Sequence, residues 1–285
     1  MKKIIALLLA LMMSLSLVAC GGNDAPAEEP AEDAPAADDA APAEDADAAA
    51  ESDLEYVKAK GTLVVGITDF APMDYKDDNG EWIGFDADMA KAFADSLGVA
   101  VEFVEIDWDN KILELDSKTI DCVWNGMTLT DEVKSAMDCS NAYCNNAQVV
   151  ILPADKAAEY ETIESMAELV FAVESGSAGE AEVLALNYQC TPVKDQASAL
   201  MEVASMTSDA AVIDSLMAAA MVGEGTGYAD LIYTLGLNSE EYGVGFRKGS
   251  DLVAALNNFF AASYADGTML TCAETYGVQA ALIEQ

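Results

Sequence analysis

The feature that most constrains the fold is a regular alternation of short apolar runs with longer amphipathic ones, which begins at residue 62. Short apolar runs are typical of buried strands, and the runs between them carry the 3.6-residue period of helices. This alternation predicts an α/β protein in which helices cover largely parallel sheets. Strands are expected at 62–68, 100–106, 119–124, 148–152, 170–174, 210–213, 231–235 and 244–247. Helices are expected at 86–97, 111–115, 131–137, 163–169, 178–186, 197–206, 215–222, 251–265 and 269–276.

Two local patterns refine this plan. DDNG at 77–80 is typical of a hairpin turn. LELDSKTIDCVWN at 113–125 and LMEVASMTSDAAVID at 200–214 each run helix, short polar link, Asp, apolar strand and polar strand end. Two lobes of similar plan would produce this repeat, and a cleft between lobes is a favoured position for a ligand.

The first twenty residues are expected to be an export signal. Lys2 and Lys3 precede an apolar stretch of about fifteen residues, which is shorter than the roughly 20 that a helix needs to span a bilayer. Small residues then lead to Cys20, a pattern that resembles a bacterial lipoprotein cleavage site. An ordinary signal peptide with a chance cysteine is the alternative.

Residues 21–53 carry twelve Asp or Glu and no Lys or Arg. Such a segment cannot bury enough apolar surface to offset its ordering entropy, so it is expected to be a disordered tether. The whole chain has a formal net charge of −38, which argues against nucleic acid as a partner because phosphate backbones are repelled.

Five cysteines follow Cys20, namely Cys122, Cys139, Cys144, Cys190 and Cys272. Their number is odd, so at least one is expected to stay free or to pair with another molecule. Their spacing matches no zinc site and the chain contains no histidine, so neither a metal nor a cofactor is expected. We expect them to act as buried small hydrophobes, with one or two bridges possible.

Polar residues gather where the expected parallel strands end. They occur in TDFAPMDY at 68–75, IDWDN at 106–110, WNGMTLTDEVK at 124–134, ESGSAGE at 174–180 and VIDS at 212–215. The carboxyl edge of such a sheet collects ligands, because backbone N–H groups and short polar side chains converge there. Each stretch also has a structural explanation, since the aromatic residues could belong to the core and Ser177 or Asp214 could cap a helix.

Taken together, these residues predict a pocket for a small zwitterion or amine. Phe70 and Trp108 supply aromatic faces, and Asp214 supplies a partly desolvated anion that would seek a cation. Asn125, Thr128 and Ser177 would add neutral hydrogen bonds.

The same motifs resemble those of the extracellular solute-binding proteins of polar amino acid ABC importers. The similar stretches include GTLVVGITDFAPMDYKDDNGEWIGFDADMAKAFADSLG at 61–98, SGSAGE, DAAVID and YGVGFRKGSDL at 242–252, and they cover nearly the whole chain from residue 54. The resemblance implies a periplasmic-binding-protein-like α/β fold of two lobes joined by two hinge strands. The first lobe would take 54–147 and 236–285, and the second 148–235.

Carried over by position, the resemblance implies a role for each candidate residue. Phe70 and Trp108 would be aromatic walls, and Asn125 would face the ligand side chain. Gly126 and Thr128 would contribute a backbone and a hydroxyl contact, Ser177 would bind the ligand carboxylate, and Asp214 would hold the α-ammonium group. The partners implied are a small-molecule ligand and a membrane permease, with a monomeric protein held by its lipid on the extracellular or periplasmic face.

One position departs from the family pattern. The family usually has an arginine where GMTLTDEV places Val133, and that arginine clamps the ligand carboxylate. The carboxylate could rest on the helix N-terminus and hydroxyls, or a lysine from elsewhere could reach in, or the ligand could lack a free carboxylate. An amino acid or a close relative is favoured over a ligand without a carboxylate.

Two other functional classes are open. One is a dehydratase-like enzyme, whose acid and base would be Asp69, Asp109 or Asp214, and the other is a sensory domain.

Overall fold

The structure is a computed structural model that describes residues 52–285. The expected signal peptide, Cys20 and residues 21–51 of the expected tether lie outside the described residues. The tether was expected to run to residue 53, but Ser52 caps α1 (Asp53–Lys60) and Asp53 begins it. Within residues 52–285, no helix has the length and hydropathy needed to cross a bilayer.

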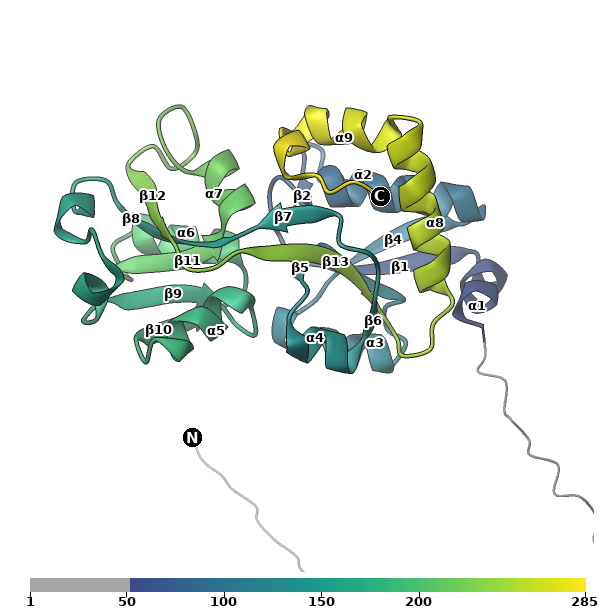
Figure 1. Ribbon diagram of the computed structural model, residues 1–285, viewed down its shortest axis with the longest axis horizontal. Coiled ribbons are helices and arrows are strands. Elements are labelled where there is room, and N and C mark those ends of the chain that lie inside the picture. Colours follow the sequence, from purple (N-terminus) through teal and green to yellow (C-terminus); the bar gives the residue numbers. More distant parts are fainter. Residues whose placement is uncertain (1–51) are drawn as a thin grey trace, which may run out of the picture. The chain divides into compact units, whose positions relative to one another are not determined.

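Two sheets organise the chain (Figure 1). The first lobe is built on a sheet in the order β4 (Ala100–Glu105), β1 (Thr62–Ile67), β5 (Cys122–Thr128), β13 (Glu240–Phe246) and β6 (Asp138–Cys139), and β7 (Cys144–Asn146) also pairs with β13. The second lobe is built on a sheet in the order β10 (Gln189–Val193), β9 (Val170–Glu174), β11 (Ala210–Asp214), β8 (Gln148–Pro153) and β12 (Leu231–Gly236). The two-lobed α/β fold expected from the sequence is therefore confirmed.

The sheets are mixed rather than largely parallel. In each sheet three adjacent strands are parallel, β4–β1–β5 and β10–β9–β11. The next strand, β13 or β8, runs antiparallel to them, and the outer strands β6 and β12 pair antiparallel with it. The antiparallel strands β8 and β13 are those that enter each sheet from the other lobe, so their direction is fixed by the crossing and not by a helical connection. The helix-to-strand repeat at 113–125 and 200–214 corresponds to β5 and β11, which occupy equivalent central places.

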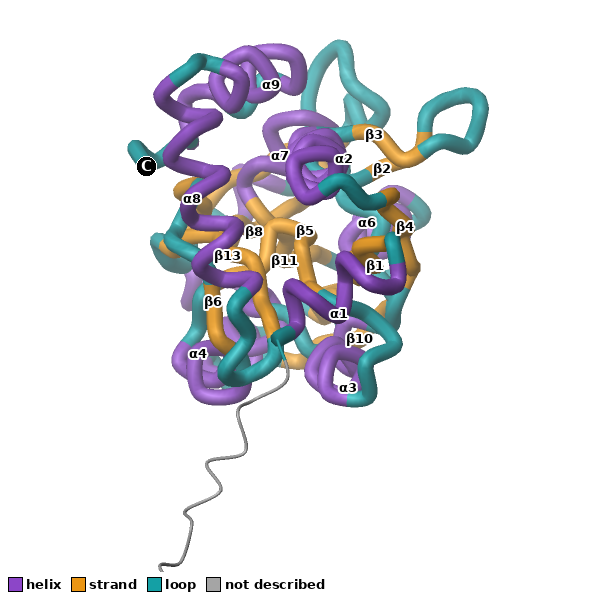
Figure 2. Tube along the Cα trace, turned by 90° about the vertical axis from the view of Figure 1, so that its right-hand side faces the viewer, coloured by secondary structure: helices purple, strands orange, loops and turns teal. Residues whose placement is uncertain are grey.

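The first lobe carries helices on both faces of its sheet (Figure 2). α2 (Phe85–Leu97), α8 (Leu252–Ala265) and α9 (Thr268–Tyr276) lie on one side, and α3 (Lys111–Asp116) and α4 (Asp131–Ala136) lie on the other. Alternate residues of β5 supply the two cores: Trp124 packs toward Phe93 and Phe260, and Val123 packs with Ile120 and Val133. Burial on both faces explains why these strands are continuous apolar runs.

The second lobe is covered in the same way. α6 (Gln196–Ala204) and α7 (Ser215–Met221) pack with Ile151 and Ile213, whereas α5 (Ala178–Ala185) and the short 3₁₀ segment Ile163–Met166 pack with Val150 and Val212. A helix was expected over 163–169. The strand β10 was missed because it is a largely exposed edge strand that contains Pro192, a residue confined to edges.

Two segments join the lobes side by side. β7 leads through Ala147 into β8, and β12 leads through residues 237–239 into β13. The backbone N–H of Leu237 donates to the carbonyl of Gln148 at 2.8 Å, and the N–H of Gln148 donates to Oδ1 of Asn238 at 2.7 Å. Figure 1 shows both connections running between the two sheets.

The remaining short elements are a hairpin and the 3₁₀ turns. β2 (Tyr75–Lys76) and β3 (Trp82–Ile83) pair around the DDNG turn, which confirms the expected hairpin. Short 3₁₀ turns occur at Trp108–Asn110, Ala157–Glu159 and Gln279–Ala281. The five cysteines of the described residues are all free, so none of the possible bridges is formed.

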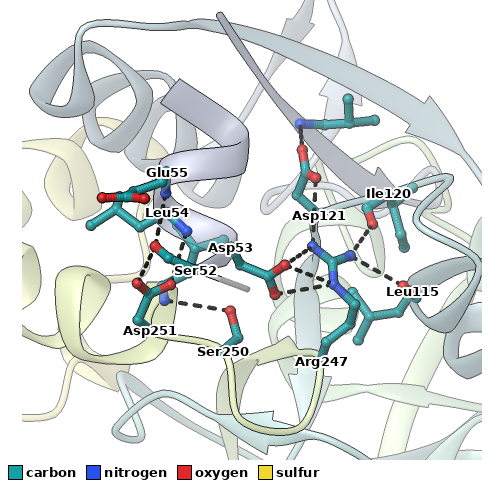
Figure 3. Close-up of polar contacts among 12 residues, drawn as sticks. Ser52, Asp53, Leu54, Glu55, Leu115, Ile120, Asp121, Arg247, Ser250 and Asp251 are labelled. Atoms are coloured by element: carbon teal, nitrogen blue, oxygen red, sulfur yellow. Dashed lines mark hydrogen bonds and ion pairs between the residues drawn. The ribbon is translucent and has the colours of Figure 1, made fainter. Parts of the chain in front are cut away.

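A buried arginine fixes the start of α1 to the first lobe (Figure 3). Nη2 of Arg247 lies 2.9 Å from Oδ1 of Asp53, and Nη1 donates to the carbonyls of Leu115 and Ile120 at 3.1 and 2.8 Å. The N–H of Leu54 also donates to Asp251 at 2.8 Å. The described chain therefore begins on the first lobe.

Candidate functional site

A cavity of about 300 Å³ lies where strands of both sheets end. From the first lobe it is lined by Trp108, Lys111, Ile112, Asn125, Gly126, Met127, Thr128, Thr130, Asp131, Glu132 and Val133; from the second it is lined by Gln148, Glu174, Gly176, Ser177, Ala178, Ala181, Gln196 and Asp214. The volume suits a small molecule of amino-acid size. Six of the seven expected ligand-binding residues line this cavity.

Asp214 ends β11 at the base of the cavity and is 4% exposed. Its carboxylate accepts hydrogen bonds from the side-chain amides of Asn146, Gln148 and Gln196. Burial, reinforced by the neighbouring Glu240 carboxylate, raises the pKa of Asp214 to about 8, although the amide donor of Gln196 opposes the rise. Burial therefore favours the neutral acid in the empty cavity, and a cation bound beside Asp214 would favour the carboxylate.

Glu174 is a second acidic residue in the cavity, and it was not predicted from the sequence. It ends β9, the parallel neighbour of β11, and is 3% exposed. Burial raises its pKa to about 8 and the nearby Asp214 adds to the rise, whereas hydrogen bonding from Thr68 and Gln196 opposes it. Among the described residues, its Oε1 has no hydrogen-bond partner.

Lys111 is the basic residue of the lining, and it too was not anticipated. Its ammonium group donates to the carbonyls of Trp108 at 3.2 Å and Gly176 at 2.9 Å, and it lies 4.9 Å from the centre of the Trp108 ring. Burial lowers the pKa of Lys111, and the carboxylates of Glu174, Glu132 and Asp109 oppose that change. Because Gly176 belongs to the second lobe, this lysine bridges the two lobes.

The expected strand end at Trp124 proves to be a strand interior. β5 continues to Thr128 because Thr128 and Met127 pair with Tyr242 and Gly243 of β13, where the register shifts as at a β-bulge. The bulged segment contains Gly126 with φ of +54°, and a Cβ there would lie 2.4 Å from Cε1 of Phe70. The glycine therefore serves the backbone geometry of the cavity wall.

The polar groups of this wall bond within the protein. Asn125 uses Oδ1 for the N–H and hydroxyl of Thr68 and Nδ2 for Asp74 at 2.7 Å and the Thr68 carbonyl at 3.1 Å. The N–H of Gly126 donates to Asp86 at 2.7 Å, and the hydroxyl of Thr128 donates to Glu240 at 2.8 Å.

The helix starts that face the cavity are capped by their own residues. Oγ of Ser177 accepts from the N–H of Glu180 at 3.1 Å, and Oγ1 of Thr130 accepts from the N–H of Val133 at 3.1 Å. The Glu180 carboxylate accepts the N–H of Gly176 at 2.7 Å. Val133 is 5% exposed and packs in the core with Ile120, so no side-chain cation occupies its place.

The two expected aromatic walls have different positions. Trp108 lines the cavity and is 7% exposed. Phe70 does not line it: its ring lies behind Gly126 and packs edge to face against Tyr242, with ring centres 6.3 Å apart. The structure therefore places one aromatic face at the cavity and the other beneath its wall.

The lobes also touch beside the cavity. Nζ of Lys194 in the second lobe lies 2.9 Å from Oε1 of Glu105 in the first lobe, and Nζ of Lys76 lies 3.0 Å from Oε2 of the same residue. A Cβ at Gly176 would lie 2.8 Å from Cα of Asp109, so the two backbones approach closely there.

Two lobes joined by two crossing segments, with a polar cavity between their strand ends, define a binding protein for a small molecule. The chain belongs to the bacterial extracellular solute-binding proteins, family 3, whose family model matches residues 63–279. It is 30% identical to the L-cystine-binding protein TcyJ of Escherichia coli (strain K12) over 233 residues, which cover 79% of this chain and 86% of TcyJ.

Solved structures show the same similarity. A mutant of ArgBP from T. maritima has a TM-score of 0.74 at 31% identity, over 79% of this chain and 99% of that chain. The ancestral amino acid-binding protein AncCDT-1, described as a precursor of cyclohexadienyl dehydratase, has a TM-score of 0.72 at 33% identity, over 79% and 99%. The family resemblance inferred from the sequence is therefore confirmed.

Proposed function

We propose that the protein is the substrate-binding lipoprotein of an ABC transporter, which captures an amino acid or a related amine-bearing small molecule and delivers it to a membrane permease. The observation that carries this proposal is the buried carboxylate of Asp214, which ends a strand inside a cavity of amino-acid size. Relatives that bind amino acids support it. A micromolar complex needs about −8 kcal/mol, which one charge-assisted contact plus burial of a small ligand can supply.

The proposed ligand contacts are the cavity-lining members of the expected set, namely Trp108, Asn125, Gly126, Thr128, Ser177 and Asp214. Phe70 would act by supporting Gly126 from behind. The lobes would take 54–147 with 236–285 and 148–235, and they would close on the ligand by bending at the two crossing segments.

The location also remains a proposal. Export followed by lipidation at Cys20 would hold a monomeric protein at the extracellular or periplasmic face of the membrane, and the acidic segment after Cys20 would separate the two lobes from the lipid.

A thermal-shift screen of the soluble chain from Gly21 onward tests the proposal. We expect an amino acid or amine to raise the melting temperature in a concentration-dependent way, because a ligand that binds only the folded state stabilises it. A screen of amino acids, amines and small peptides without any such shift would contradict it.

An enzyme on the same scaffold is the second candidate. The observation in its favour is that Glu174 and Asp214 both have pKa values of about 8, as suits acid catalysis near neutral pH. Product analysis by mass spectrometry after prolonged incubation of a bound ligand with the protein decides between the two, since a binding protein returns the ligand unchanged.

A further inference from the structure

Three donors on the first-lobe side of the cavity wall bond within the protein. The N–H of Gly126 donates to Asp86, the hydroxyl of Thr128 donates to Glu240, and the amide of Asn125 donates to Thr68 and Asp74. A carboxylate placed there would have to displace charged or buried acceptors from these donors, and a displaced buried acceptor loses its hydrogen bond without compensation.

The basic side chain of the cavity lining also bonds within the protein. Val133 stands where the family usually has its arginine, and Lys111 directs its ammonium group to two backbone carbonyls. Lys111 is the only basic side chain in the lining among the described residues, against four acidic ones, Asp131, Glu132, Glu174 and Asp214. The lining therefore has more acidic than basic groups, and a ligand with a net positive charge suits it better than a neutral zwitterion does.

Among the described residues, one buried polar side-chain atom of the cavity lining lacks a hydrogen-bond partner. Oε1 of Glu174 is buried without a hydrogen-bond partner, and its side chain is 3% exposed. A buried polar atom without a partner is costly, so a ligand that donates a hydrogen bond to it gains more than one that offers another acceptor. Glu174 and Asp214 end the neighbouring parallel strands β9 and β11 and both line the cavity, so a ligand cation between them would face both carboxyl groups.

We propose that Glu174 is a ligand-binding residue and that the ligand is an organic amine or guanidine without a carboxylate, held between Glu174 and Asp214. This inference rests on the proposed function and narrows its ligand class. The donors of Asn125, Gly126 and Thr128 serve here to brace the cavity wall.

Matched pairs of compounds that differ only in the carboxylate test the inference. We would titrate the soluble chain from Gly21 onward with agmatine and arginine, 1,5-diaminopentane and lysine, and phenethylamine and phenylalanine, using isothermal calorimetry. We expect the decarboxylated member of at least one pair to bind at least about tenfold more tightly than its amino acid. Burying a carboxylate without a hydrogen-bond donor costs more free energy than a tenfold change in affinity represents. Equal or tighter binding of the amino acid in every pair that binds would overturn the inference.

Variants locate the contact. Glu174→Gln should weaken the binding of the preferred amine at least about tenfold, because a charge-assisted hydrogen bond is lost. The substitution of an exposed residue, Glu168→Gln, should leave the affinity unchanged. Circular dichroism melting of both variants identifies any loss of fold. An unchanged affinity of folded Glu174→Gln would overturn the role of Glu174. Val133→Arg should shift the preference within each pair toward the amino acid.

The outcomes separate this inference from the proposed function. Tight binding of any amino acid, with weak binding of its amine, would overturn the inference and leave the proposed function standing. Binding of neither class in these titrations and in the wider screen would overturn both.

Discussion

The substitution Asp214→Asn removes the charge proposed to hold the ligand cation and keeps the side chain almost the same size. The carboxylate is 4% exposed, so solvent screens its interaction with a ligand very little. A charge-assisted hydrogen bond of this kind contributes roughly 1.5–3 kcal/mol, which corresponds to about a 10- to 150-fold loss of affinity.

The size of this loss should depend on pH. Without ligand, burial and the carboxylate of Glu240 favour the protonated form of Asp214, whose pKa is about 8. A cation bound at pH 7 must therefore displace a proton, and each pH unit below the pKa weakens binding by up to about tenfold per proton displaced. The affinity of the natural protein should rise between pH 6 and 9, and that of Asp214→Asn should rise less steeply.

Isothermal calorimetry at pH 6, 7, 8 and 9 measures both effects. Titration at pH 7 in buffers of different ionisation enthalpy counts the protons released, and we expect the variant to release fewer than the natural protein. The exposed Asp155→Asn serves as the matched control. Dissociation constants of Asp214→Asn within about twofold of the natural values across this range would refute the reasoning, since the expected loss is at least about tenfold.

Three further predictions concern stability. Burial raises the pKa values of the carboxyl groups of Asp214 and Glu174 to about 8 and that of Asp86 to about 7. The stability that these groups give the ligand-free fold is therefore full below their unfolded pKa of about 4 and is lost as the pH rises from there through 7 to 8. The melting temperature should be lower at pH 9 than at pH 6, and a higher one would contradict this. Gly126→Ala should lower the free energy of unfolding by about 1–3 kcal/mol in urea titrations, because the residue has φ of +54° and its Cβ would meet Phe70, whereas Gly227→Ala, where a Cβ meets open space, should have little effect. Arg247→Met should cost about 3 kcal/mol or more because it leaves Asp53 without its buried cation, whereas Asp121 keeps Lys60 at 2.6 Å. Urea midpoints equal to those of the natural protein would count against the clamp at the start of α1.

The sequence predicted Asp214 and missed Glu174, although both end parallel strands of the second lobe. Asp214 stands out because four apolar residues precede it and a helix follows. Glu174 has the same setting after VFAV, but the serine and glycine residues that follow it drew attention to the helix cap instead. A carboxylate that directly ends a buried strand is the signal that could have identified it.

Other features depend on contacts between distant segments. The extension of β5 past Trp124 requires pairing with β13, more than a hundred residues away. Asn146, Gln148 and Gln196 surround Asp214 only because the crossing strands and α6 converge there. Lys111 was missed because a lysine at the start of a helix is ordinarily a solvent-exposed residue.

A structure determined with the tightest ligand bound tests the central claim most directly. We expect one molecule in the cavity beside Trp108, with its ammonium or guanidinium nitrogen about 2.7–2.9 Å from a carboxylate oxygen of Asp214, as in charge-assisted hydrogen bonds. A ligand bound elsewhere, or one in the cavity whose cationic group points away from Asp214, would contradict it.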